Sequence, residues 1–231
     1  MSLIKVQDVK KIYNGGEGEV VALGGISLNV DEGEFVALMG PSGSGKSTLL
    51  TMLGAMNPPT SGAVVVDDID VYSLSAERRA DFRSEYLGFV FQQFQLIPYL
   101  TALENVMLPL AITGKPNREQ TEMAIAVLEK VGLAKKENRL PNQLSGGEQE
   151  RVAIARAIVN EPPILFADEP TGALDSKNSE EIMNLFKDLN TEGQTIIMVT
   201  HNQEFLTYVK RAVFIRDGLL DDNQHVKKLA V

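Results

Sequence analysis

The sequence contains no cysteine, and its charges are weighted towards acidic residues. Without cysteine the chain forms no disulfide and uses no thiol as a nucleophile or metal ligand. A net charge of −9 disfavours sequence-independent binding to nucleic acids, which needs a basic face that releases counterions from the phosphates. We therefore expect no nucleic-acid partner.

Long apolar runs are also missing. No uninterrupted run approaches the roughly 18 residues that a transmembrane helix needs. Residues 1–5, MSLIK, lead into no apolar segment of the signal-peptide kind, so we expect no signal peptide. With 231 residues, 44% of them hydrophobic, the chain is long enough for one large domain or a domain with a subdomain. If it serves a membrane, we expect it to do so from the water side.

The most informative stretch is rich in glycine and fits G-x-x-x-x-G-K-[ST], the pattern of a phosphate-binding loop. Its glycines lack a Cβ, so the backbone turns tightly and brings its N–H groups close to an anion. Lys46 places a positive charge on the β- and γ-phosphates, and the Ser47 hydroxyl is left to coordinate Mg²⁺. The predicted nucleotide ligands here are Gly40, Ser42, Gly43, Ser44, Gly45, Lys46, Ser47 and Thr48.

The segments on both sides of this loop support the prediction. Residues 35–39, FVALM, are typical of a buried strand, and residues 47–53, STLLTML, are typical of a helix. A helix that begins at the loop adds the positive end of its dipole to the phosphate site. The alternative is a turn of glycine and serine without a ligand, which the order of strand, loop, lysine, serine and helix disfavours.

Two acids follow a fully apolar segment, residues 164–167, that is typical of a buried strand. In an open α/β sheet, ligands bind at the carboxyl ends of the strands. Asp168 is predicted to hold Mg²⁺, directly or through water, and Glu169 to act as general base on the attacking water. The alternative is that the two acids only end a strand.

Two more polar side chains follow predicted strands. Gln92 is expected to ligate Mg²⁺ or contact the attacking water through its amide oxygen, although Gln93 and Gln95 compete for this role. His201 is expected to donate a hydrogen bond to the γ-phosphate. The alternatives are a polar strand end for the glutamine and a structural role for the histidine. His225 lies in a polar tail, and we assign it no role.

Two further features are compatible with a bound nucleotide. Ser145, Gly146 and Gly147 stand at a predicted helix start and resemble a second anion site, which makes sense if this helix closes over the ATP of another molecule. An ordinary serine cap followed by glycines is the alternative. Tyr13 follows the first strand and is a candidate to stack on an adenine ring, although a single tyrosine in a loop is weak evidence.

The patterns along the chain predict an α/β fold. We expect a P-loop NTPase core with a mainly parallel sheet, an N-terminal antiparallel β layer and an inserted helical subdomain. The chain is predicted to be one domain, in which about 1–92 and 144–231 form the core with its β layer and about 93–143 form the helical subdomain. Among the expected elements are a strand over 3–11, a strand region over 20–30 broken at Gly24 and Gly25, and helices over 149–160, 179–190 and 202–210.

Together these motifs resemble those of the ATP-binding cassette (ABC) ATPases, from about residue 4 to residue 218. The most specific marks are residues 144–148, LSGGE, which look like the ABC signature, and their position before the apolar Walker B strand. The family order is complete: Tyr13 as the A-loop, Walker A at 40–48, Gln92 as the Q-loop, the signature, Walker B with Asp168 and Glu169, the D-loop at 173–175 and His201 as the H-loop. Segments 88–94 and 170–175 look most like the lipoprotein-release, macrolide-efflux and cell-division group.

The resemblance implies an Mg²⁺-dependent ATPase with ATP as its nucleotide. Two cassettes would form a head-to-tail homodimer, with each ATP between the Walker A loop of one subunit and the signature of the other. On the family pattern, the signature ligands are Ser145, Gly146, Gly147 and Glu148, the metal ligands are Ser47, Gln92 and Asp168, the catalytic residues are Glu169, His201 and Gln92, and Asp175 communicates across the interface.

The resemblance also implies a membrane partner. A separate transmembrane permease would dock near Gln92 to Leu100 and hold the protein on the cytoplasmic face of the cell membrane, for export or extraction of a lipophilic or peptide-like substrate. Phe94, Leu96 and Tyr99 make this stretch apolar enough to take a helix of the permease, although they could instead pack the subdomain. Glu148 and Glu150 stand where related cassettes often carry glutamine, which we do not interpret as loss of activity.

Two other functions stay open at this point. In the first, the cassette transports nothing, and its closure signals through a membrane partner, as in the cell-division branch. In the second, the protein is a soluble ABC protein of DNA repair or translation. Such proteins typically carry a coiled-coil insertion or a second cassette, and this sequence shows neither.

Overall fold

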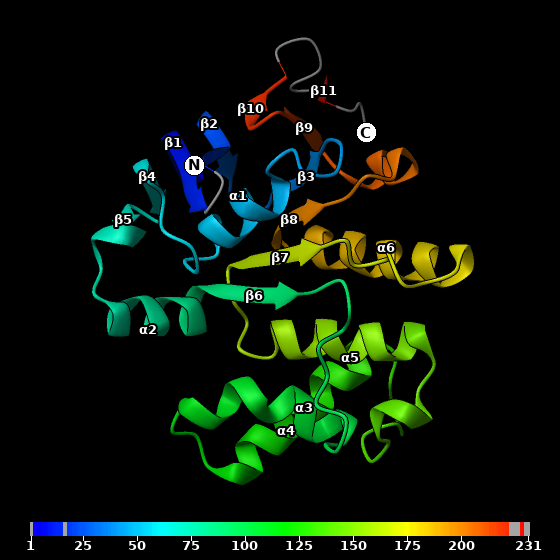
Figure 1. Cartoon of the computed structure of the whole chain (residues 1–231). Coiled ribbons are helices and arrows are strands. Elements are labelled where there is room, and N and C mark those ends of the chain that lie inside the picture. The colour runs from blue at the N-terminus through cyan, green and yellow to red at the C-terminus, as the bar shows by residue number, and fades with distance from the viewer. Residues whose placement is uncertain (1, 16–17, 222–226, 229–231) are drawn as a thin grey trace.

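A computed structural model describes residues 2–15, 18–221 and 227–228, so His225 lies outside the described residues. Within them, two sheets and a group of helices make up the molecule (Figure 1). The fold is that of a P-loop ATPase, with an antiparallel N-terminal sheet beside a mainly parallel one, as the sequence predicts. No helix of the described ranges is long and apolar enough to cross a membrane.

The smaller sheet is antiparallel, in the order β2-β1-β4-β5. Its strands are β1 (Ser2–Gly15), β2 (Gly18–Asp31), β4 (Ser61–Val66) and β5 (Ile69–Asp70). The predicted break at Gly24 and Gly25 is wrong, because β2 runs through both glycines. The register instead shifts there, since Val9 faces Ile26 while Lys10 faces Gly24. Gly25 takes a φ of 125°, which only glycine adopts easily, and thus provides a β-bulge.

The larger sheet has a parallel centre. β9, β3, β8, β7 and β6 lie side by side in that order, all parallel, and the short β10 and β11 pair antiparallel with β9. The bounds are β3 (Phe35–Met39), β6 (Leu87–Val90), β7 (Ile164–Asp168), β8 (Thr195–Val199), β9 (Arg211–Arg216), β10 (Leu219–Leu220) and β11 (Lys227–Lys228). Strands buried on both faces explain the nearly continuous apolar runs in the sequence.

Both faces of the parallel sheet carry a hydrophobic core. In β3, Phe35, Ala37 and Met39 join the cluster that includes the helices α3 to α6, whereas Val36 and Leu38 join the cluster under α1 and the antiparallel sheet. This alternation follows from the two-residue period of a strand. The parallel sheet is therefore held between the helical group on one side and α1 with the β layer on the other.

Four of the α-helices begin at side-chain caps, and two, α1 and α4, do not. Ser75, Thr101, Ser145 and Asp175 each accept a hydrogen bond from the backbone of the helix that they precede. The helix α1 begins instead at Gly45, without such a cap. The bounds are α1 (Lys46–Leu53), α2 (Ala76–Tyr86), α3 (Ala102–Met107), α4 (Asn117–Lys130), α5 (Gly146–Ile158) and α6 (Ser176–Thr191), with 3₁₀ turns at Val71–Ser73, Leu108–Ile112, Pro141–Gln143 and Gln203–Tyr208.

Three helix predictions need correction. Two of them, α5 and α6, begin three residues earlier than their predicted starts at 149 and 179, because Ser145 and Asp175 cap them there. The segment predicted as a helix over 202–210 is the 3₁₀ turn Gln203–Tyr208. The helix α5 packs against α3 and α4 below it and against β6 and α6 above it, so it connects the helical group to the parallel sheet (Figure 1).

Candidate nucleotide site

The carboxyl ends of four parallel strands meet at one edge of the larger sheet. The glycine-rich loop follows β3, Gln92 follows β6, Asp168 ends β7, and His201 follows β8. A cavity of about 770 Å³ opens there. It is lined by Val20, Val21, Ala22, Gly40, Pro41, Ser42, Gly43, Gly45, Lys46, Ser47, Thr48, Gln92, Asp168, Glu169, Val199 and His201.

The loop before α1 has a shape that only glycines allow. Gly40, Gly43 and Gly45 have φ angles of 148°, 78° and 102°. A Cβ at Gly40 would lie 2.0 Å from the carbonyl oxygen of Ile215, and one at Gly45 would lie 2.5 Å from that of Ala22. The loop is therefore pressed against β9 and β2, and its backbone has no room for side chains at these positions.

The start of α1 is prepared for an anion. Gly45 has no side chain to cap the helix, so the first backbone N–H groups are left for a ligand. Ser44 is buried, and its hydroxyl is without a hydrogen-bond partner among the described residues. Buried polar groups normally have partners. An uncapped helix start beside an unpartnered hydroxyl fits a phosphate chain.

Lys46 lies in the same loop with its ammonium group turned back on the backbone. It donates hydrogen bonds to the carbonyl oxygens of Gly40 and Pro41, at 2.8 and 2.7 Å. Burial lowers the pKa of Lys46, while the nearby carboxylates of Glu169 and Asp168 raise it. The two carbonyls hold the ammonium group in place until a stronger anionic partner replaces them.

Oxygen atoms gather opposite the loop. The Ser47 hydroxyl donates a long hydrogen bond of 3.4 Å to the Asp168 carboxylate. Burial raises the pKa of Asp168, which shows that its charge lacks a full partner here. A hydroxyl and a carboxylate at this distance, beside the amide of Gln92, form the oxygen set that a small hard cation such as Mg²⁺ prefers.

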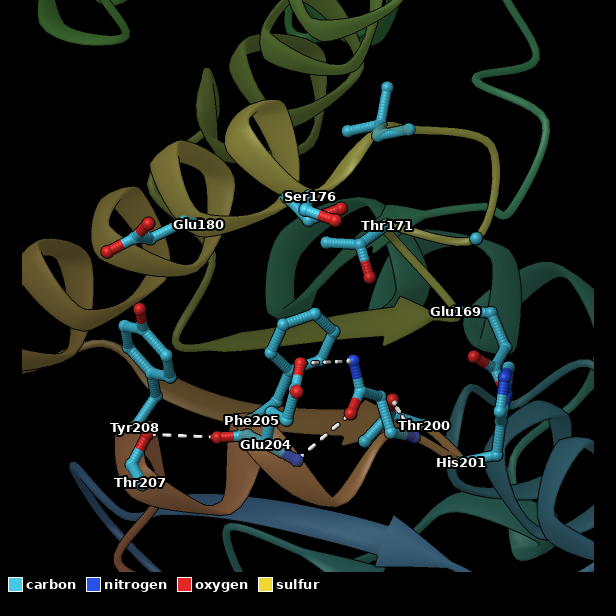
Figure 2. A pocket seen from close by; sticks show the side chains of 14 residues that line it. Glu169, Thr171, Ser176, Glu180, Thr200, His201, Glu204, Phe205, Thr207 and Tyr208 are labelled. Carbon is cyan, nitrogen blue, oxygen red and sulfur yellow. Dashed lines mark hydrogen bonds and ion pairs between the residues drawn. The ribbon is translucent and has the colours of Figure 1, made fainter.

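Glu169 and His201 form a pair at the far side of the cavity. The Glu169 carboxylate lies 2.9 Å from Nδ1 of His201, and Figure 2 shows the two side chains facing each other. Glu169 has a φ of 49°, in the left-handed region, and its N–H donates to the carbonyl oxygen of Val199 on β8. A strained backbone at a carboxylate in a cavity is typical of functional sites.

A second hollow of about 480 Å³ lies on the other side of Glu169, between α6 and the turn Gln203–Tyr208 (Figure 2). The charged side chains that line it, apart from His201, are the acids Glu169, Glu180 and Glu204. This acidic lining repels phosphate. The cavity with Lys46 and the open start of α1 is therefore the candidate nucleotide site.

The family follows from the sequence that builds this site. The ABC transporter family profile matches residues 23–172, which is more than half of the chain. This chain belongs to the ABC transporter ATP-binding family. Its chemistry is that of an ATPase, as the motifs of the sequence predict.

Relatives of two kinds are similar to the cassette. The macrolide export ATP-binding/permease protein MacB of Syntrophobacter fumaroxidans is 50% identical over 96% of the chain, which spans only 31% of that relative. An ABC transporter ATP-binding protein of Bacillus subtilis, YknY, is 49% identical over 94% of both chains. The predicted group of macrolide-efflux type cassettes is thereby confirmed.

The solved structures agree. The dimeric structure of the bacterial ABC transporter cassette MJ0796 has a TM-score of 0.89 and 46% identity, and covers 99% of both chains. A second dimeric structure of the same cassette, in a post-hydrolysis state bound to ADP and phosphate, has the same TM-score at 45% identity. These neighbours confirm the predicted fold.

Besides the buried Ser44, six predicted nucleotide contacts line neither hollow of the cassette. The signature residues Ser145, Gly146, Gly147 and Glu148 lie at the start of α5, and Asp175 caps α6. Tyr13 is on β1, where its hydroxyl accepts a hydrogen bond of 2.6 Å from Asn57 and its ring lies 5.1 Å from the ammonium group of Lys11.

Ser145 and Glu148 form reciprocal hydrogen bonds at the start of α5. Ser145 accepts a hydrogen bond from the N–H of Glu148, and the Glu148 carboxylate accepts one of 2.8 Å from the N–H of Ser145. Lys136 pairs with the same carboxylate at 3.1 Å, and these hydrogen bonds and charges lower the pKa of Glu148. In the single cassette, Ser145 therefore acts as an ordinary helix cap, which was the alternative to an anion site.

Sequence reasoning missed five residues that line the cavity: Val20, Val21, Ala22, Pro41 and Val199. Val20 and Val21 line its mouth from β2 and are 61% and 56% exposed, which is unusual for adjacent valines. Tyr13 faces Val20 across the antiparallel pair. The signal was present in the sequence as two valines just after a turn, but the strand pattern alone does not tell which face meets the ligand.

Proposed function

We propose that this cassette is the ATP-hydrolysing subunit of an ABC transporter and that it drives a separate membrane permease, for export or extraction of a lipophilic or peptide-like substrate. The uncapped start of α1, with Lys46 inside it and Glu169 opposite, carries the ATPase part. Export is supported by the likeness to MacB proteins, whose names join ATP-binding and permease functions.

The polar residues of the cavity have separate roles at the γ-phosphate. Ser47, Asp168 and Gln92 would hold Mg²⁺, which neutralises phosphate charge when bound. Glu169 takes a proton from the attacking water as general base. His201 holds the Glu169 carboxylate at 2.9 Å and is placed to contact the γ-phosphate. Lys46 exchanges its backbone carbonyls for the β- and γ-phosphates.

The signature residues are assigned to a second subunit's nucleotide. Because Ser145, Gly146 and Gly147 lie away from the cavity of their own chain, they contact ATP only in a head-to-tail pair. The dimeric MJ0796 structures support such a pair. In it, Glu148 lies beside the bound nucleotide and Asp175 beside the interface. Tyr13 and Val20 together offer a face for the adenine ring.

The permease is assigned to a groove of about 420 Å³ between α2, β6 and the helical group. Phe91 and Gln95 reach it from the segment after β6, and Ile112, 74% exposed, stands at its rim. Within the predicted docking stretch, Leu96 instead packs against the hydrophobic core. The proposal therefore moves the permease contact from the whole of 92–100 to this groove, which holds mostly apolar surface.

The deciding experiment uses the variant Glu169→Gln. Without the base it binds ATP but hardly hydrolyses it, so the closed pair accumulates. Size-exclusion chromatography with Mg²⁺ and ATP is expected to show a dimer, and without ATP a monomer. Adding Ser145→Ala is expected to abolish the dimer.

The matched control is Glu180→Gln, an exposed acid on α6 that lines the second hollow. It is expected to hydrolyse ATP at the wild-type rate and to form no stable dimer. A Glu169→Gln variant that hydrolyses ATP as fast as the wild type would refute the assigned base. A dimer that persists without the Ser145 hydroxyl would refute the shared site.

A further inference from the structure

Glu150 is a buried acid that the proposed function does not use. It lies in the second turn of α5, is 0% exposed, and has no hydrogen-bond partner for either carboxylate oxygen among the described residues. Ionised carboxylates are almost never buried without a partner. Burial raises the pKa of Glu150 to about 8, against the opposing effect of the Arg156 charge.

The charged neighbours of α5 leave Arg156 as the group that acts on Glu150. The segment 91–100 and the strand β6 carry no charged side chain. Several other charged groups on and around α5 have their own partners: Glu148 with Lys136, Arg151 with Glu181 of α6, Glu104 of α3 with Thr101, Lys130 of α4 with Glu192, and Asp175 with Asn178. Glu129 of α4 and Glu180 of α6 are exposed.

Arg156 holds the turn that follows Gln92. Its guanidinium group donates to the carbonyl oxygens of Phe94 and Gln95, at 2.8 and 2.6 Å. Both residues adopt left-handed φ angles, 57° and 50°, although neither is glycine. Two consecutive residues in this conformation persist only when the surroundings hold them. Arg156 is therefore the clamp of this turn.

Glu150 follows Gly146 by one helical turn and so lies on the same side of α5. A Cβ at Gly146 would lie 3.3 Å from the side chain of Leu174 and 4.0 Å from the ring of Phe94, so this side of the helix start is close to the turn. Arg156 in turn lines the groove assigned to the permease. The buried acid, the clamp, the strained turn and the groove are thus neighbours.

We propose that Glu150 is a positioning residue for Gln92, and that its charge decides how firmly Arg156 holds the turn at 94 and 95. When the Glu150 carboxyl is neutral, both terminal nitrogens of the Arg156 guanidinium group stay bonded to the carbonyl oxygens of Phe94 and Gln95. The ionised carboxylate attracts the guanidinium group and competes with them. Gln92, two residues before the turn, then moves more freely in the nucleotide cavity.

The first test follows amide hydrogen exchange without nucleotide, on the whole chain. Peptides covering 93–97 are compared between wild type and Glu150→Gln at pH 6, 7, 8 and 9, so the intrinsic pH effect on exchange cancels. The two proteins are expected to exchange equally at pH 6. At pH 9 the wild type is expected to exchange about tenfold faster, because its ionised carboxylate competes with the two carbonyls for the guanidinium group.

Two variants control this test. Glu129→Gln, an exposed acid on α4, is expected to match the wild type at every pH. Arg156→Lys, which keeps the charge but loses the fork, is expected to exchange fast at every pH and to make Glu150→Gln silent. An equal ratio at all pH values, or faster exchange spread along α5 and β6, would overturn the proposal.

The second test measures ATP hydrolysis and rests on the proposed role of Gln92. At pH 9, Glu150→Gln is expected to raise kcat about threefold over the wild type with an unchanged KM, and to change neither at pH 6. In a Gln92→Ala background the same substitution is expected to leave kcat unchanged. An effect that survives there would mean that Glu150 does not act through Gln92. Because exchange needs no nucleotide, the clamp is tested separately from the ATPase.

Discussion

Two helix starts in this cassette are both rich in glycine, but one has free backbone N–H groups and the other has a complete capping box. The α1 start, GPSGSGKS, has a glycine at the cap position and open N–H groups, whereas the α5 start, LSGGE, is closed by Ser145 and Glu148. The first is ready for phosphate in one chain. The second already has its hydrogen bonds and gains from a ligand only when one arrives from outside. Glycine content alone therefore does not make an anion site; at α1 the absent cap comes together with the glycine loop and Lys46, whereas α4 lacks a cap without them.

The buried charges of the two starts differ in the same way. Lys46 in α1 has two carbonyl oxygens to hold it, so it is compensated until ATP binds. Glu150 in α5 has no hydrogen-bond partner among the described residues. The charge of Lys46 is thus compensated until a ligand binds, whereas burial disfavours the ionised form of Glu150.

The largest difference between the two helix starts is expected when one glycine of each is replaced by alanine. Gly45→Ala places a Cβ 2.5 Å from a backbone carbonyl oxygen of β2, which cannot give way, so ATP affinity is expected to fall at least about 100-fold. Gly147→Ala meets only the side chain of Asn178 and is expected to keep the affinity of the single chain. Equilibrium binding of a fluorescent ATP analogue measures both. Equal losses would remove the distinction between the two starts.

The next effect concerns the buried acid of α5. The pKa of Glu150 is raised to about 8 in the folded chain, so between its ordinary value and pH 8 the folded state binds more protons than the unfolded state. Stability therefore falls as pH rises through this window, by up to roughly 1.4 kcal/mol per pH unit.

Glu150→Gln removes this loss. Its advantage in the free energy of unfolding is expected to be small near pH 5 and to grow towards pH 8, as urea unfolding at a series of pH values will show. The exposed variant Glu129→Gln serves as the reference. A constant difference across the series would mean that the carboxyl is ionised throughout.

A smaller effect is expected from removing one hydroxyl at each start. Ser145→Ala loses the cap of α5 and is expected to cost about 1 kcal/mol of stability. Ser44→Ala removes a buried hydroxyl without a partner and is expected to be neutral or slightly stabilising without nucleotide, but to weaken ATP binding. Thermal unfolding with and without ATP measures both. The opposite order of stabilities would contradict the assignment of caps.

The smallest effect is expected from Glu148→Gln, since glutamine also completes a capping box. The variant loses the charge attraction of Lys136, which is expected to cost about 0.5 kcal/mol or less. The pKa of Glu148 is lowered in the fold, so its contribution is present above its ordinary value and is lost as pH falls through the lowered one. Below this lowered pKa the variant and the wild type are expected to unfold together. A difference that persists there would come from the cap and not from the charge.

Much of the nucleotide site was predictable, because its signals are short and local. The loop of three glycines and Lys46 needs only nine consecutive residues, and the strands before Glu169 and His201 are apolar runs of a few residues. Helix starts were harder: α5 and α6 begin three residues before the predicted positions, since Ser145 and Asp175 cap them and hydrophobic spacing does not record a cap. A strand pattern likewise does not distinguish a β-bulge from a break, so Gly24 and Gly25 were predicted to interrupt β2.

Other features depend on packing that brings distant segments together. Glu150 stands in the polar run EQER, which suggests a solvated helix face, yet its side chain is fully buried. Val20 and Val21 read as strand residues, and only the position of β2 beside the glycine loop makes them part of the cavity. The signature residues lie away from the cavity of their own chain, a separation that spacing along the chain does not encode.

The sequence by itself determined the chemistry of this protein: a glycine loop that accepts phosphate, a lysine, and acids at strand ends. These depend on local backbone freedom and on residue type. Tertiary structure decided which groups meet, because the carboxyl ends of the parallel strands β3, β6, β7 and β8 converge at one edge of the sheet. It also decided which helix start stays open, and which acid is deprived of water, since both depend on the atoms that neighbouring elements place around them.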